Sequence, residues 1–132
     1  MVHVALAFLM AVTAGENTAP DYETALAASQ KESKPLLILI GAPWCASCQV
    51  MKRETIQPMM ETGKLEHCVV TYVDKDERPE LAQQLMKGET LPQIVVFAKQ
   101  PGGWKRFSLT GMQSQHRMAE LLGRATSEGT LR

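Results

Sequence analysis

The spacing of apolar and polar residues predicts helices that alternate with short strands. Residues 21–32 carry apolar and small side chains at helical spacing, and Asp21 is placed to cap the first turn. Residues 36–40 form an uninterrupted apolar run, which is typical of a central strand covered on both faces. A helix is therefore expected before the first strand.

A second helix is predicted to begin at Cys45, directly after that strand. One side of it is marked by residues at steps of three and four: Cys48, Met51, Thr55 and Met59. Proline has no backbone N–H, and its ring clashes with the preceding turn, so Pro58 should kink or end this helix. The first cysteine should thus lie at the helix N-terminus.

The second half of the chain continues the alternation. Strands are predicted over residues 69–73 and 93–98, with a helical segment over residues 79–86 between them. Pro101-Gly102-Gly103 makes a turn short enough for residues 104–110 to return as an antiparallel strand. A closing helix has its apolar face at Met118, Leu121, Leu122 and Ala125, and residues 127–132 have no pattern. We expect an α/β fold with a central mixed sheet flanked by helices, ending in an antiparallel hairpin and a C-terminal helix.

The N-terminal segment has a pattern of its own. Residues 2–14 are apolar apart from His3 and Thr13, and they end on small residues that suit signal cleavage. We expect a secretion signal over residues 1–14 and a domain over residues 15–132. The segment lacks basic residues, so a buried first strand and a start site chosen too late are the alternatives. With a signal the expected location is the periplasm; without one it is the cytoplasm.

Composition narrows the class of partner. Fourteen Lys plus Arg balance fourteen Asp plus Glu, so no net charge draws the protein toward nucleic acid or acidic membranes. The longest uncharged runs, residues 1–15 and 35–51, are shorter than the ~18–20 apolar residues that cross a bilayer. From its length of 132 residues we expect the chain to form one domain. We expect no nucleic-acid partner and no stable insertion in a membrane.

Three cysteines cannot all pair within one chain, and two of them stand in Cys45-Ala46-Ser47-Cys48, which is the spacing of a site. On the first turn of a helix such a pair can form a disulfide, and the helix dipole favours the thiolate of Cys45. Cys45 is then the attacking thiolate at the mouth, and Cys48 the covered, resolving thiol. A permanently closed disulfide and half of a zinc site are the alternatives. Zinc needs two further ligands, and the sequence has no second paired spacing, so we expect no metal.

Two motifs together resemble the thioredoxin superfamily. Trp44-Cys45-Ala46-Ser47-Cys48 follows an apolar strand, and Thr90-Leu91-Pro92 precedes a later one. The resemblance runs from about residue 20 to residue 125 and is greatest to small exported thioredoxins, including the C-terminal domain of the electron transporter DsbD.

The resemblance implies a role for each matching residue. Cys45 matches the nucleophile and Cys48 the resolving cysteine. The implied substrate-binding residues are Trp44, which flanks the site, Thr90, Leu91, whose backbone pairs with substrate, and Pro92, the cis-proline that faces the sulfurs. The alternative for Pro92 is an ordinary trans proline that opens an edge strand.

Two features depart from the family pattern. Thioredoxins usually place a buried Asp six residues before the first active-site cysteine and pair it with a Lys; here these positions are Leu39 and Tyr72. Ala46-Ser47 also replaces the usual Gly-Pro between the cysteines. Proton transfer at Cys48 would then use water or the Ser47 hydroxyl, and the redox poise of the family does not carry over.

The resulting hypothesis is a thiol–disulfide oxidoreductase that reduces disulfides in exported proteins through Cys45 and Cys48. We expect a monomer without a cofactor, with disulfide-containing proteins as substrates and an upstream thiol as electron donor. The alternatives are a non-catalytic module that binds protein chains between Trp44, Leu91 and Pro92, and a copper-delivery protein. Cys68 is expected to be a buried free thiol that packs as a small apolar residue.

Overall fold

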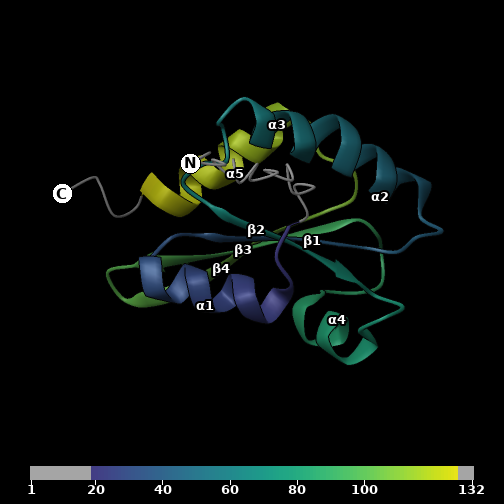
Figure 1. The fold of residues 1–132 in the computed structure, drawn as a ribbon, viewed down its shortest axis with the longest axis horizontal. Helices are drawn as coiled ribbons and strands as arrows, with labels where there is room; N and C mark the ends of the chain where they lie inside the picture. Colours follow the sequence, from purple (N-terminus) through teal and green to yellow (C-terminus); the bar gives the residue numbers. More distant parts are fainter. Residues whose placement is uncertain (1–18, 128–132) are drawn as a thin grey trace, which may run out of the picture.

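Four strands form one mixed sheet in the computed structural model, which describes residues 19–127 (Figure 1). β1 (Leu36–Gly41) is central: it pairs in parallel with β2 (Val69–Asp74) and antiparallel with β3 (Gln93–Gln100). β4 (Gly103–Thr110) pairs antiparallel with β3, so the sheet order is β2-β1-β3-β4. The predicted mixed sheet with a terminal hairpin is confirmed.

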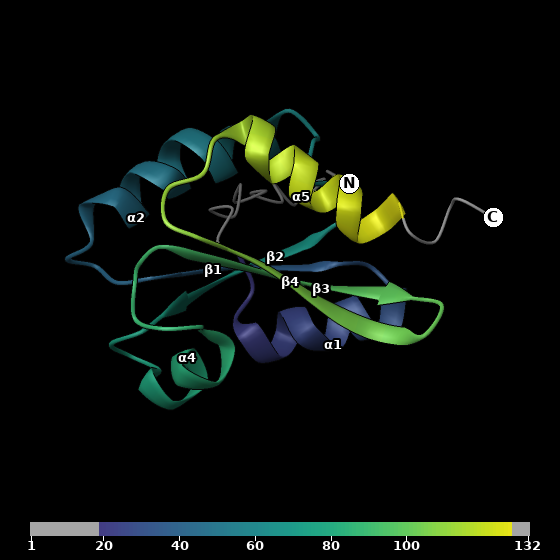
Figure 2. The ribbon, with the colours of Figure 1, turned by 180° about the vertical axis from the view of Figure 1, so that it is seen from behind.

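Helices cover both faces of this sheet (Figures 1 and 2). On one face lie α1 (Tyr22–Glu32) and α4 (Pro79–Leu85). On the other lie α2 (Ala46–Met51), α3 (Gln57–Glu61) and the C-terminal helix α5 (Gln115–Ser127). The helix that precedes the first strand is capped as predicted, because the Asp21 carboxylate accepts the Thr24 N–H at 2.8 Å.

β1 is buried on both faces, as its uninterrupted apolar sequence predicted. Leu36, Ile38 and Ile40 pack toward α1 and α4, whereas Leu37 and Leu39 pack toward the helices of the other face. None of the five is more than 4% exposed. Burying a Leu or Ile side chain of this kind stabilises the folded state by about 1.5–3 kcal/mol. β1 is therefore held firmly in the sheet, and the cysteines follow its C-terminal end.

The helix after Cys45 passes through Pro58 instead of ending there, since α3 continues to Glu61. A π-helical turn, Lys52–Ile56, comes directly before it, and the Gln57 N–H donates to the Lys52 carbonyl. Proline cannot donate to the carbonyl one turn back. The wider turn shifts the hydrogen-bond pattern just where that donor is missing, which lets the helix continue.

The predicted secretion signal over residues 1–14 lies outside the described residues, as do residues 128–132. Within residues 19–127, none of the helices is both long enough and apolar enough to span a bilayer.

Candidate active site

The two cysteines of the motif lie where β1 gives way to α2. Cys45 is the N-cap of α2, and it is joined by a disulfide to Cys48, with the two Cα atoms 5.2 Å apart. The Cys48 N–H donates to Cys45 Sγ at 3.2 Å, so this sulfur occupies the place of a capping oxygen. The Ser47 hydroxyl lies 3.4 Å from the same sulfur. After reduction, these donors and the helix N-terminus would stabilise a thiolate on Cys45.

Both cysteines are buried in the disulfide form: Cys45 is 7% exposed and Cys48 is 4% exposed. We expected Cys45 to be open at the mouth and Cys48 to be covered, but this difference is too small to separate them. Both belong to a buried cluster with Ala42, and Leu91 packs against this cluster, which the sequence spacing did not reveal. The distinction between the two cysteines therefore rests on the N-cap position of Cys45.

Gly41 allows Cys48 to lie directly against the end of β1. A Cβ atom at Gly41 would lie 3.0 Å from Cys48 Cβ and 3.1 Å from its Sγ, which is closer than almost any side chain tolerates. Glycine removes that contact because it has no Cβ. The absence of a side chain at this position lets the helix start pack onto the strand end.

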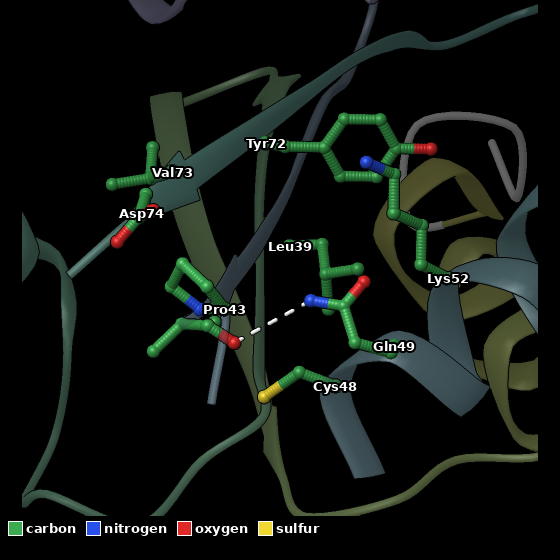
Figure 3. A pocket seen from close by; sticks show the side chains of 10 residues that line it. Leu39, Pro43, Cys48, Gln49, Lys52, Tyr72, Val73 and Asp74 are labelled. Carbon is green, nitrogen blue, oxygen red and sulfur yellow. Dashed lines mark hydrogen bonds between the residues drawn. The ribbon is translucent and has the colours of Figure 1, made fainter. Parts of the chain in front are cut away.

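A pocket of about 160 Å³ lies beside Cys48, between β1, β2 and the helix that starts with α2 (Figure 3). Leu39 and Tyr72, which pair across the two strands, both line it. Lys52 reaches over the Tyr72 ring, with its Nζ 4.3 Å from the ring centroid. Burial raises the pKa of Tyr72, so its phenol stays protonated near neutral pH.

Leu39 and Tyr72, which stand at the positions of the usual Asp and Lys in the family pattern, give this pocket no acid–base pair. Its wall carries apolar Leu39 and the side chain of Cys48, together with polar groups of Gln49, Lys52 and Asp74. A water molecule needs about 30 Å³ and two or more polar partners, so the pocket has room and partners for a few. Water in this pocket could accept a proton from the reduced Cys48.

Trp44 stands before the first cysteine with 69% of its surface exposed. Its indole N–H donates to the Asp76 carboxylate at 2.7 Å. Asp76 is itself held in the loop after β2, where the Asp74 carboxylate accepts the backbone N–H groups of Asp76 and Glu77. The sequence gave no signal for this role of Asp76, because its contact with Trp44 spans 32 positions.

The fold brings the Thr90-Leu91-Pro92 motif to the cysteines. Leu91 packs against Ala42, Cys45 and Cys48, and the Leu91–Pro92 peptide bond is cis. Thr90 is exposed, whereas Pro92 is buried and its carbonyl accepts the Gly111 N–H at 2.7 Å. The structure therefore places Leu91 against the cysteine cluster, and Thr90 and Pro92 are its neighbours in the chain.

The third cysteine lies away from this site. Cys68 is a free, half-buried thiol just before β2, and it packs against the core on the α2 and α5 side. Burial raises its pKa to about 11. Within residues 19–127 there is also no cluster of three His, Cys, Asp or Glu side chains that could hold a metal ion.

The raised pKa of Cys68 predicts slow alkylation. In the disulfide form, iodoacetamide at pH 8 should label it hundreds of times more slowly than the same thiol in urea, because roughly one molecule in a thousand carries the thiolate. The rate should climb about tenfold per pH unit until pH approaches about 11. Mass spectrometry of quenched samples measures it. Equal rates in the folded and unfolded protein would contradict the burial of this thiol.

A family model for thioredoxin-like proteins matches residues 16–99, which is more than half of the chain. A search of curated protein sequences found no match.

Solved structures with the same fold include several thioredoxins. Chloroplastic thioredoxin z is 24% identical, with a TM-score of 0.68 over 83% of this chain and 94% of its own. A thioredoxin from Thermus thermophilus is also 24% identical, with a TM-score of 0.68 over 85% of this chain and 89% of its own. Deadhead, a germline-specific thioredoxin from Drosophila melanogaster, is 18% identical, with a TM-score of 0.64 over 83% and 98%. At these identities the likeness establishes the fold.

Proposed function

Because the chain belongs to the thioredoxin-like family, we propose that it is a thiol–disulfide oxidoreductase that reduces disulfides in exported proteins. The thioredoxin-like fold with its cysteine pair supports thiol–disulfide chemistry in general. The observation that carries the proposal is the Cys45–Cys48 disulfide at the start of α2, with Leu91 packed against it.

The reaction begins from the reduced dithiol. The Cys45 thiolate attacks one sulfur of a client disulfide, the client S–S bond breaks, and the departing client sulfur takes up a proton. Cys48 then loses its proton to pocket water and attacks Cys45 Sγ in the mixed disulfide. The second client thiol leaves, two electrons have passed to the client, and the protein holds the Cys45–Cys48 disulfide seen in the structure.

Client recognition is assigned to the surface around the cysteines. The exposed face of Trp44 offers an apolar contact, and its orientation is fixed by the hydrogen bond to Asp76. Leu91 packs against the cysteine cluster, and we assign to the backbone of Thr90 and Leu91 the pairing with an extended client segment, as a strand adds to a sheet edge. This arrangement favours clients whose disulfide lies in an extended, accessible stretch.

The direction of electron flow follows from the surroundings of the two sulfurs. Ala46 and Ser47 place no positive charge between the cysteines, so the Cys45 thiolate has only the helix start, the Cys48 N–H and the Ser47 hydroxyl to stabilise it. Leu39 adds an apolar wall to the pocket that Cys48 lines, and an apolar setting disfavours a second thiolate beside Cys45. The reduced form therefore lacks the stabilisation of strongly oxidising enzymes. An upstream dithiol must supply two electrons for each cycle, and the periplasm is the proposed setting.

Insulin reduction tests this function. The protein should accelerate the turbidity that dithiothreitol produces in insulin solutions, and its potential against glutathione should lie below about −180 mV. A module that only binds chains through Trp44 and Leu91 would leave the turbidity rate unchanged. A potential near −120 mV, with rapid oxidation of reduced unfolded proteins, would reverse the proposed direction.

A further inference from the structure

Gln93 is a fully buried polar side chain at the start of β3, directly after Pro92. Only 1% of its surface is exposed. Its side-chain amide points back at the loop that joins α4 to β3. Its Nε2 donates to the Lys87 carbonyl at 2.8 Å and to the Thr90 carbonyl at 3.0 Å, and its Oε1 accepts the Lys87 N–H at 3.0 Å.

These three bonds use both protons of the amide and one acceptor site. The loop they hold has little else to fix it, because residues 87–90 are exposed and contribute no side chain to the core. Gln93 thus ties a solvent-facing loop to a strand that is buried. Thr90, one of the tied residues, is the one before Leu91.

A second buried glutamine, Gln113, holds the residues that hydrogen-bond to Pro92. Gln113, 9% exposed, donates from Nε2 to the carbonyls of Thr110 and Gly111 at 3.1 Å each. The backbone carbonyl of Gln113 accepts the hydroxyl of Thr55, which lies in the π-helical turn after α2, at 2.9 Å. Since the Gly111 N–H donates to the Pro92 carbonyl, this set links the helix that carries the cysteines to Pro92.

We propose that Gln93 and Gln113 are positioning residues for client binding, which hold the Thr90–Pro92 backbone in register with Cys45. The inference rests on the proposed function. A peptide client must pair with this backbone while its sulfur meets Cys45, so a displaced backbone weakens the productive complex. A small disulfide without a peptide backbone needs only access to the sulfur and is less sensitive to the displacement.

The test compares Gln93→Met and Gln113→Met with wild type on two substrates: a peptide with one internal disulfide, and hydroxyethyl disulfide. Methionine keeps the approximate length and volume of glutamine and removes its side-chain hydrogen bonds, leaving the bond from Thr55 to the Gln113 backbone in place. For each variant we expect kcat/KM on the peptide to fall by about tenfold, mainly through KM, with a clearly smaller fall on hydroxyethyl disulfide. Hydrogen exchange at the Lys87 amide should also become faster in Gln93→Met.

Gln100→Met is the matched control. Gln100 lies at the far end of the same strand, is 6% exposed, and donates from Nε2 to the Ala125 carbonyl at 3.2 Å. The substitution is the same and the site is also buried, so a general effect of replacing a buried glutamine by methionine appears here too. The ratio of the two kcat/KM values should stay at the wild-type value in this variant.

The inference is overturned if Gln93→Met and Gln113→Met lower both kcat/KM values by the same factor, or if Gln100→Met changes the ratio as much as they do. Should Gln93→Met fail to fold, Gln113→Met decides alone, because its bonds lie in a different loop. A wild-type protein that reduces neither substrate would refute the proposed function instead.

Discussion

Cys48→Ser should accumulate mixed disulfides with its clients, whereas Cys45→Ser should trap almost none. Cys45 caps α2, where the Cys48 N–H and the Ser47 hydroxyl both meet its sulfur, so its thiolate is the stabilised one. Attack by Cys45 survives the loss of Cys48, but the mixed disulfide then has no internal thiol to resolve it. Cys45→Ser should lose reductase activity by several orders of magnitude, since a serine hydroxyl is no nucleophile here.

Non-reducing gels of proteins captured from an oxidised extract, followed by mass spectrometry of the linked peptides, measure this difference. Both variants should carry Cys68→Ser, so that the remaining free thiol contributes no adducts. Trapping of clients to the same extent by both variants would overturn the assignment, because it would mean that either thiol can attack first.

Much of the fold follows from local patterns in the sequence. The run from Leu36 to Ile40 predicted a strand buried on both faces, and it is one. The strand–cysteine–helix order placed Cys45 at a helix start, and its sulfur is indeed the cap. Such features depend on residues within one or two turns of each other, which is the range over which periodicity and capping act.

The remainder of the site depends on contacts between distant residues. Cys45 is buried contrary to expectation, in a cluster with Ala42 and Cys48 against which Leu91 packs. Asp76 accepts a hydrogen bond from Trp44, which is 32 positions away in the sequence. The Gln93 side chain donates hydrogen bonds to the carbonyls of Lys87 and Thr90, in a loop of exposed residues. The sequence does not reveal the partners of a buried glutamine such as Gln93, because its side chain bonds backbone atoms, which every residue type has.

Leu39→Asp should lower the free energy of unfolding by about 2–5 kcal/mol at neutral pH, which is the largest loss of stability we expect near the site. Leu39 is 4% exposed, packs in the core on the α2 side and lines the pocket beside Cys48. The substitution removes apolar contacts and places a carboxyl group among Tyr72, Cys48 and other core residues. Restoring the acid of the family pattern is therefore costly without the lysine that usually accompanies it.

The pH dependence of the stability of Leu39→Asp separates the effect of the new charge from the effect of the changed side-chain shape. Burial should raise the pKa of the new carboxyl above its unfolded value of about 3.9, so the folded state holds the proton that the unfolded state has lost. Stability then falls as pH rises from about 4 to the folded pKa, by at most about 1.4 kcal/mol per pH unit. Lys52, which also lines the pocket, opposes this shift, but its ammonium is on an exposed side chain.

Leu39→Asn is the control, because it has the same shape and no titratable group. Urea unfolding at pH 5 and pH 8 should give a difference between the two variants that is larger at pH 8. If the difference stays constant, pocket water solvates the carboxylate fully, and Leu39 does not keep the surroundings of Cys48 apolar. The same result would remove the reason for expecting a protonated Cys48 in the reduced protein, since both groups share one wall of the pocket.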